Sequence, residues 1–271
     1  MSPLWRDEVG IYLAQRRICM VRIRRGIRPS LAREENHTGP LAAAGWDGVL
    51  ALLEQQLAQR TWSDARVRVV ISDQWVRHTV VPWSDALVSG AERLAHAHQL
   101  MAGTFGAAMS DWTVSLSEAP PGVSRLASAM PTALLEALRE ATLRYGQKLV
   151  SVQPQLIAAY NTWRHVLPTV AAAWFVTVEE GSLAALRMCG DGIDRVHAVR
   201  IGLDWERELK RLQTFGRLAS ASPTDGRVYV DLPPALRALR PDMSADLEWL
   251  DEPSPPLTTL HQLEHLRRRA A

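Results

Sequence analysis

Two stretches of sequence decide the fold: VGIYLAQRRICMVRI at 9–23 and WFVTVEEGSLAALRMC at 174–189. In each, an apolar run is followed by a short polar segment and a second, alternating run, which is the pattern of a β-hairpin. If Tyr12 is aligned with Thr177, Arg22 falls on Arg187. Two copies of one hairpin, each opening one half of the chain, predict a duplicated α/β architecture. Two unrelated hairpins are the alternative.

Both halves continue in the same way. After each hairpin the sequence predicts a further strand, a helix and a buried strand. In the first half the helix is expected over 46–60 and the buried strand over 67–72. In the second half the elements are a strand over 194–201, a helix capped by Asp204, and a strand over 226–231.

The first half also carries additional segments. A helix is predicted over 84–104, and its apolar stripe is Ala91, Leu94, Ala95 and His98. Two strands follow, over 112–116 and 123–129. A helix over 131–145 opens at Pro131 and ends at Gly146, and a strand over 148–152 and a helix over 154–163 then lead to the second hairpin.

The composition limits the classes of function. The chain has 271 residues, 47% of them hydrophobic and 22% charged, as in ordinary globular proteins. Its formal net charge of +2 does not favour nucleic-acid binding. Cys19 and Cys189 lie far apart in the sequence, which favours a reducing compartment. Residues 1–8 lack an apolar signal core, and no apolar run reaches the ~20 residues that span a bilayer. We therefore expect a soluble, cytoplasmic protein that does not insert directly into a membrane.

A resemblance enters at the centre of the chain. The segment AMP at 129–131, the helix after it, Gly146, and KLVSVQP at 148–154 resemble the middle of the PilM family of type IV pilus assembly proteins. They also resemble the cytoplasmic domain of the type II secretion protein GspL. The segment WVRHTVVPW at 75–83 is similar to the strand and proline that precede the inserted subdomain of that family.

The resemblance implies an α/β, actin-like (ribonuclease-H-like) fold of two lobes with an inserted small α+β subdomain. The first lobe would span 1–168, with the inserted subdomain at about 84–130 and a connecting helix at 154–167. A second, truncated lobe would span 169–252, and 253–271 would form a linker and a basic C-terminal helix or tail.

In actin-like proteins the opening hairpin of each lobe holds phosphate through an Asp-x-Gly pattern. The Asp holds magnesium or its waters, and the Gly lets backbone N–H groups approach the phosphate. By resemblance these positions are Tyr12 and Ala14 in the first lobe, and Thr177 and Glu179 in the second. Pro233 and Pro234 stand where a pair of glycines would contact adenosine.

None of these side chains suits a nucleotide. Tyr12 does not coordinate magnesium at neutral pH, and the carboxylates of Glu179 and Glu180 would repel phosphate. Proline has no N–H and a fixed backbone, so it does not replace the paired glycines. We expect no nucleotide cofactor and no catalytic residue. Whether Arg16 and Arg17 keep a remnant anion site stays open.

The resemblance implies a non-enzymatic scaffold on the cytoplasmic face of the inner membrane. PilM-like proteins capture a short cytoplasmic segment of a bitopic, PilN-like membrane protein in a groove between the first lobe and the inserted subdomain. Here the groove would involve 69–81 and 84–129. The apparatus served (pilus, secretion or competence), the contact residues and the oligomeric state stay open.

Two other interpretations of the sequence stay open. A divergent actin-fold ATPase or sugar kinase needs a carboxylate, for which Glu179, Glu180 or Asp73 are candidates. A third possibility is an interaction domain of unrelated α/β fold. His261 and His265 have a zinc-compatible spacing, but Glu264 is the one nearby carboxylate, so we expect no metal. Trp5 and Trp249 are expected to be exposed and available to a partner.

Overall fold

The computed structural model describes residues 6–24, 30–39, 45–168, 172–190, 192–202, 205–218, 226–237 and 247–250. The chain divides into two compact units. The first takes its described residues from Met1–Trp75 and Thr132–Thr162, and the second from Val76–Pro131 and Trp163–Pro256. The expected linker and tail at 253–271 lie outside the described residues, as do Trp5, Asp204, His261, Glu264 and His265.

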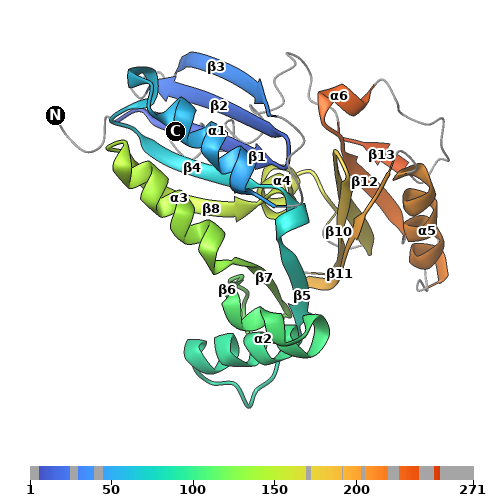
Figure 1. Ribbon diagram of the computed structural model, residues 1–271. Helices are drawn as coiled ribbons and strands as arrows, with labels where there is room; N and C mark the ends of the chain where they lie inside the picture. Colours follow the sequence, from blue (N-terminus) through green and yellow to red (C-terminus); the bar gives the residue numbers. More distant parts are fainter. Residues whose placement is uncertain are drawn as a thin grey trace. The chain divides into compact units, whose positions relative to one another are not determined.

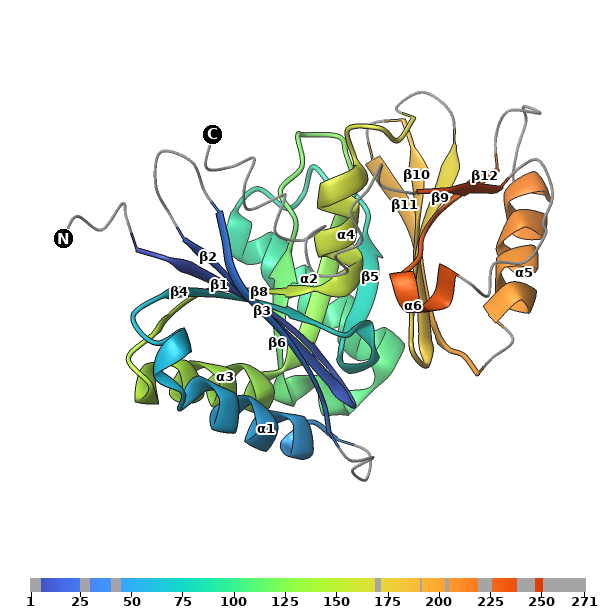
Figure 2. The ribbon, with the colours of Figure 1, turned by 90° about the horizontal axis from the view of Figure 1, so that it is seen from above.

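The first unit contains β1 (Glu8–Ala14), β2 (Arg17–Arg24), β3 (Ser30–Thr38), α1 (Asp47–Leu57), β4 (Arg66–Ile71), α3 (Thr132–Arg144), β8 (Lys148–Pro154) and α4 (Gln155–Trp163) (Figure 1). Its five strands form one sheet in the order β3-β2-β1-β4-β8. β1 is antiparallel to β2 and parallel to β4, and β4 is parallel to β8. Helices α1 and α3 lie together on one face of this sheet (Figure 2).

Burial explains why these residues form this sheet. β1 and β2 are apolar and buried along most of their length, as central strands covered on both faces should be. The edge strand β3 is largely exposed and carries Arg33, Glu34 and Glu35. Charged side chains on an edge strand discourage pairing with other chains.

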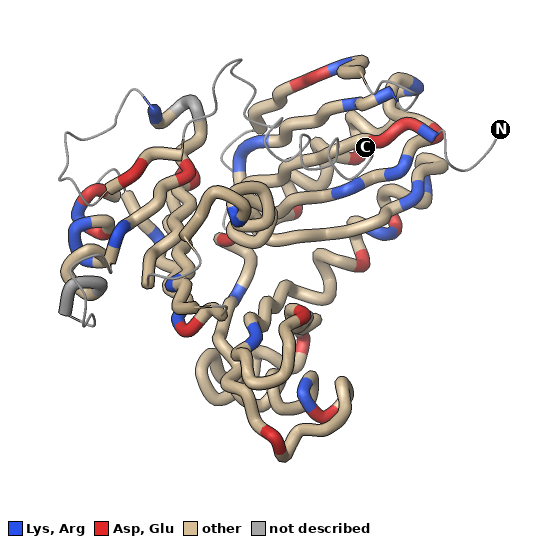
Figure 3. Tube along the Cα trace, turned by 180° about the vertical axis from the view of Figure 1, so that it is seen from behind, with Lys and Arg blue, Asp and Glu red and all other residues tan. Residues whose placement is uncertain are grey.

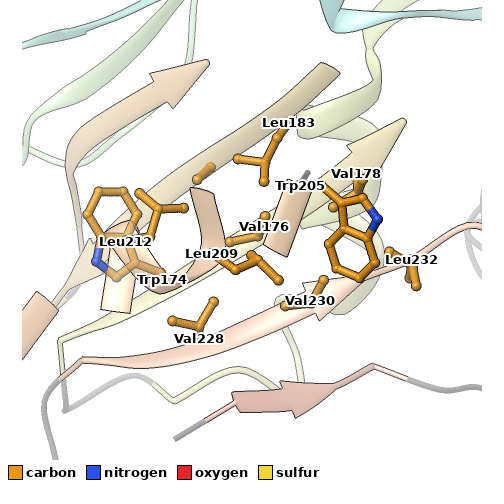
Figure 4. Close-up of a cluster of buried hydrophobic side chains, with 11 residues drawn as sticks. Trp174, Val176, Val178, Leu183, Trp205, Leu209, Leu212, Val228, Val230 and Leu232 are labelled. Atoms are coloured by element: carbon orange, nitrogen blue, oxygen red, sulfur yellow. The ribbon is translucent and has the colours of Figure 1, made fainter. Parts of the chain in front are cut away.

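The second unit contains a matching five-stranded sheet. Its elements are β9 (Ala173–Glu179), β10 (Ser182–Cys189), β11 (Gly192–Arg200), α5 (Trp205–Leu218), β12 (Arg227–Asp231), α6 (Pro234–Arg237) and β13 (Leu247–Trp249). The strand order is β11-β10-β9-β12-β13. Trp205, Leu209 and Leu212 recur at helical spacing on α5 and pack against Val176, Leu183, Val230 and their neighbours in the sheet (Figure 4).

The two sheets repeat each other strand by strand. β1, β2, β3, β4 and β8 correspond to β9, β10, β11, β12 and β13, with the same parallel and antiparallel pairings. The turn pairs Ala14 with Arg17 in the first hairpin and Glu179 with Ser182 in the second. This register places Tyr12 on Thr177, as the sequence alignment does.

The second unit also holds the inserted segment, which has β5 (Arg77–Val81), α2 (Gly90–Phe105), β6 (Trp112–Leu116) and β7 (Arg125–Pro131). Its three-stranded sheet has the order β5-β7-β6. Helix α2 begins with a capping box between Ser89 and Glu92 and buries Ala97 and Met101 against the sheet. Edge strand β5 lies along β11, and the Ser124 hydroxyl donates to the Ile193 carbonyl at 2.6 Å.

The structure differs from the sequence reading at several points. The predicted stripe on the inserted helix is wrong: Ala91, Leu94, Ala95 and His98 are exposed. Pro131 ends β7 rather than opening the next helix, which starts at Thr132. The inserted segment falls in the same compact unit as the second sheet, where β5 contacts β11. The expected lobe boundaries stay a prediction.

Trp249 is also placed differently from the expectation. It is partly buried, and its ring meets that of Trp205 edge-on with centroids 6.1 Å apart. It packs against the core of the second sheet. The ring therefore stabilises this unit instead of standing free for a partner.

Candidate functional site

The first candidate loop is the turn between β1 and β2. Because Ala14 pairs with Arg17, Gln15 and Arg16 alone make the turn. Asp64 is the one non-glycine residue with positive φ among the described residues, so this turn has no left-handed residue. One form of backbone nest for phosphate pairs a right-handed residue with a left-handed one. The described turn lacks this form of nest.

One side chain and one backbone carbonyl at this turn have partners on or after β3. Arg17 lies 3.5 Å from the amide oxygen of Asn36 on β3, and the carbonyl of Arg16 accepts a hydrogen bond from the Gly39 N–H at 2.9 Å. Tyr12 is half-buried and pairs with Cys19 on one side and Val70 on the other. An aromatic ring fills the position that an aspartate holds in the expected pattern.

Asp73 lies at the carboxyl end of β4, where the parallel strands of this sheet end together. The Ser72 N–H donates to the Leu13 carbonyl at 2.8 Å, which holds the segment after β4 against β1. The Asp73 side chain is buried, and one carboxylate oxygen accepts from the Leu156 N–H at 2.8 Å. Leu156 is in the first turn of α4, so Asp73 caps that helix and interacts with its dipole.

The second candidate loop joins β9 and β10 and consists of Glu180 and Gly181. Gly181 has φ of 87°, a conformation that favours glycine. Glu179 is buried, and its carboxylate accepts from the Ser182 hydroxyl at 3.1 Å. Thr177 is buried too, and its hydroxyl lies 3.4 Å from the Ala184 carbonyl. This loop keeps a glycine, but a buried carboxylate occupies its base.

The third candidate segment follows β12. Asp231 ends the strand opposite Thr177 and is buried. Pro234 then opens the short helix α6, where a missing N–H costs no helical hydrogen bond. The Leu236 N–H donates to the Pro233 carbonyl at 2.9 Å. The two prolines therefore start a helical turn, which the sequence reading did not predict.

The predicted residues thus form two sets. In the first unit Tyr12 and Ala14 lie near Asp73, at the carboxyl ends of β1 and β4. In the second unit Thr177 and Glu179 lie near Asp231 and the two prolines, at the ends of β9 and β12. Sequence reading missed Asp231 and Ser182. Their positions in the sequence could have identified them. Asp231 ends a buried strand, and Ser182 faces Glu179 across a two-residue turn.

The described residues contain neither a metal-binding cluster nor a membrane-spanning helix. No group of three or more His, Cys, Asp or Glu side chains there could hold a metal ion. None of the described helices combines the length and apolarity needed to cross a bilayer. Among the described residues, both basic and acidic residues are scattered over each unit (Figure 3).

Comparisons with known proteins identify the class of fold. No protein-family model matches the sequence, and no curated protein matches it. A chain of the PilM–PilN type IV pilus biogenesis complex is 15% identical, with a TM-score of 0.69 over 97% of this chain and 98% of that chain. The cytoplasmic domain of EpsL, an inner membrane component of the type II secretion system of Vibrio cholerae, is 12% identical, with a TM-score of 0.60 over 97% and 95%.

A third structure extends the same likeness. A Bacteroides thetaiotaomicron protein with an actin-like ATPase fold and unknown function is 11% identical, with a TM-score of 0.55 over 86% of this chain and 84% of that chain. At these identities the likeness shows the fold. The chain has the actin-like fold, as the resemblance in the sequence implied.

Proposed function

We propose that this protein is a non-enzymatic cytoplasmic scaffold of a type IV pilus or type II secretion-like assembly platform at the inner membrane. Its partner would be a bitopic, PilN-like membrane protein, bound through a short cytoplasmic segment. The observation that carries the proposal is the full-length likeness to a chain of the PilM–PilN complex, supported by the likeness to the EpsL cytoplasmic domain.

The candidate loops support the non-enzymatic part of the proposal. The β1–β2 turn lacks a left-handed residue, and Glu179 stands at the base of the β9–β10 turn. Pro234 opens a helix where the expected pattern has paired glycines. With Tyr12 in place of the metal-coordinating aspartate, these changes remove three features of nucleotide binding: metal coordination, a backbone cradle for phosphate, and close approach of adenosine.

The alternative of a divergent ATPase or kinase needs a carboxylate free to act on a phosphate or on water. Asp73 is committed to the Leu156 N–H, and Glu179 is bonded to the Ser182 hydroxyl. Both interactions give the buried carboxylates structural roles. Two of the three candidate carboxylates thus have structural roles, which favours the scaffold over the enzyme.

The partner test is a binding measurement. Bitopic inner-membrane proteins encoded near this protein supply the candidates, and peptides of their cytoplasmic segments would be titrated against the full chain by fluorescence anisotropy. Saturable binding that a scrambled peptide does not reproduce is the expected result. Failure of every such peptide, together with no co-purification of the full-length membrane proteins in detergent, would remove the partner proposal.

A further inference from the structure

Two features of the inserted segment lack a covering neighbour among the described residues. The first is the outer edge of β6. The second is a flank of α2 that we call the α2 flank, whose residues are exposed and apolar or uncharged: Ala91, Leu94, Ala95, His98, Ala102 and Phe105. Both belong to the same small sheet and its helix.

The β6 edge has hydrogen-bonding groups that point away from its sheet. β6 is the last strand in the order β5-β7-β6, and within the described chain it pairs with β7 alone. The Ser117 N–H donates to the Leu126 carbonyl at 2.8 Å. Ser117 and every second residue before it therefore direct their peptide groups toward β7. By that alternation the peptide groups of Val114 and Leu116 face outward. The N–H of Trp112 donates to Met109, which leaves the Trp112 carbonyl for the edge.

The α2 flank lies on the β6 side of the helix. Arg93 lines a hollow with Val81, Pro82 and Trp83, so it marks the side of α2 that faces the end of β5. Leu94, His98 and Phe105 lie about a quarter-turn or more from Arg93 around the helix, beyond the buried row of Ala97 and Met101. The connection from β5 through α2 to β6 is expected to be a right-handed crossover, and this also places the α2 flank on the β6 side of the helix.

Neither the β6 edge nor the α2 flank carries the charged side chains that usually prevent association at exposed strand edges and apolar surfaces. From Leu94 to Ser117, Asp111 is the one formally charged residue. The edge strand β3 of the first sheet, by contrast, carries Arg33, Glu34 and Glu35. An uncharged edge beside an exposed apolar helix flank is typical of an interface. It also brings no like charges together if two copies meet.

We propose that a second copy of this chain binds here, with β6 pairing antiparallel to β6 of the second copy about a two-fold axis at Val114. The strand WTVSL is symmetric in polarity about Val114. Trp112 would face the second copy's Leu116, and Thr113 would face the second copy's Ser115. The result is a continuous six-stranded sheet, and the isologous contact closes the dimer.

The α2 flank favours a second copy of the chain, rather than a bound peptide, as the partner of the β6 edge. A two-fold axis perpendicular to the sheet keeps both copies of α2 on one face, side by side over the new strand pair. Leu94, His98 and Phe105 of each copy would then project toward the other helix. A single added peptide strand satisfies the edge but leaves this flank uncovered. This inference does not depend on the proposed scaffold function.

A cross-linking experiment tests the register. In a Cys189→Ser background, which removes the exposed native thiol, Thr113→Cys and Ser115→Cys are made as separate chains. The pairing places Cα of residue 113 about 4.5 Å from Cα of residue 115 in the other copy, within the reach of a disulfide. Two copies of either variant alone would place the thiol-bearing residues about 8 Å apart, too far to bridge. Disulfide dimers are therefore expected in the mixture and not in either variant alone.

Sedimentation equilibrium tests the α2 flank. The unmodified chain should show a dimer of twice 30.1 kDa. Leu94→Glu with Phe105→Glu should weaken dimerisation by roughly tenfold or more, because four carboxylates would then meet across the two-fold axis. Val88→Glu is the matched control. Val88 is 80% exposed and precedes the helix, so this change should have little effect.

Each outcome counts for or against the proposal. A monomer at concentrations of about 100 μM would overturn it, since that excludes even a weak specific dimer. A dimer that is unchanged by the flank substitutions and gives no mixed cross-link would overturn this interface. Circular dichroism of the double variant confirms that loss of the dimer is not loss of the fold.

Discussion

The β1–β2 and β9–β10 hairpins are the same structure with different turns. Both place two residues in the turn, and both have a register irregularity in the outer strand pair after the equivalent arginine, between Arg22 and Ile23 and between Arg187 and Met188. The turns themselves are Gln15-Arg16, with no left-handed residue, and Glu180-Gly181, with one. The strands and their irregularities are therefore preserved where the turns have diverged.

The two arginines differ in what surrounds them. Arg22 donates to the Asp7 carboxylate at 2.8 Å and to the carbonyls of Thr61 and Ser63, so it joins three segments of the first unit. Arg187 pairs with Asp194 at 3.0 Å, on the neighbouring strand of its own sheet. The same strand position thus serves a tertiary role in one unit and a local role in the other.

The largest expected effect comes from the matched core positions Ile18 and Leu183. Both are fully buried, and both follow the hairpin turn by two residues. Replacing either by Ala should lower the free energy of unfolding by about 3 kcal/mol, from lost burial and the cavity left behind. Hydrogen exchange read by mass spectrometry should show each loss within its own unit. Equal loss of protection in both units after one substitution would contradict their description as separate cores.

Much of this repeat could be predicted from sequence, because alternation and turn residues are local signals. The alignment of Tyr12 with Thr177 needed only the spacing around each turn. The α2 stripe could not be predicted in the same way. Apolar residues lie on two sides of that helix, and only the position of the sheet decides that Ala97 and Met101 are buried while Leu94 is exposed.

The roles of the site carboxylates were hidden for a similar reason. Asp73 and Leu156 are 83 positions apart, and their hydrogen bond exists only once β4 and β8 are paired. Asp231 reads in the sequence as the polar end of a strand. Its place opposite Thr177 follows from the parallel register of β12 with β9.

Substitutions of Arg22 and Arg187 test whether these equivalent arginines have different roles in the two units. Arg22→Ala should cost about 2 kcal/mol, since it leaves a half-buried carboxylate and two carbonyls without their donor. Arg187→Ala should cost about 1 kcal/mol, because Asp194 is more exposed and can be hydrated. Urea denaturation of both variants measures the difference. A larger loss for Arg187→Ala would reverse the assigned roles.

Substitutions in the two hairpin turns should have smaller effects on stability. Gly181→Ala should destabilise the second unit by about 1 kcal/mol, because alanine is strained at positive φ. Arg16 is the equivalent residue of the first turn, is exposed and has no positive φ, so Arg16→Ala should have a clearly smaller effect. Thermal unfolding of the two variants, compared side by side, measures this. Equal shifts would mean that the turns do not differ as described.

The smallest expected effect concerns the inserted segment, which has no counterpart among the described residues of the second half. Hydrogen bonds from the backbone and side chain of Ser89 lower the pKa of Glu92. A lowered pKa contributes stability above the unfolded pKa of Glu92, and this contribution is lost as the pH falls through the folded pKa. The effect is small because Glu92 is fully exposed. Amide exchange in the first turn of α2 should accelerate on acidification, and Glu92→Gln should remove that pH dependence.

The central claim is that neither hairpin retains a nucleotide site, and calorimetric titration of the full chain with ATP and magnesium tests it most directly. We expect no saturable heat, either in the unmodified chain or in a Glu179→Ala, Glu180→Ala variant. Magnesium-dependent ATP binding with micromolar affinity, weakened by Asp73→Asn, would contradict this claim. It would favour the alternative that the protein is an actin-fold ATPase.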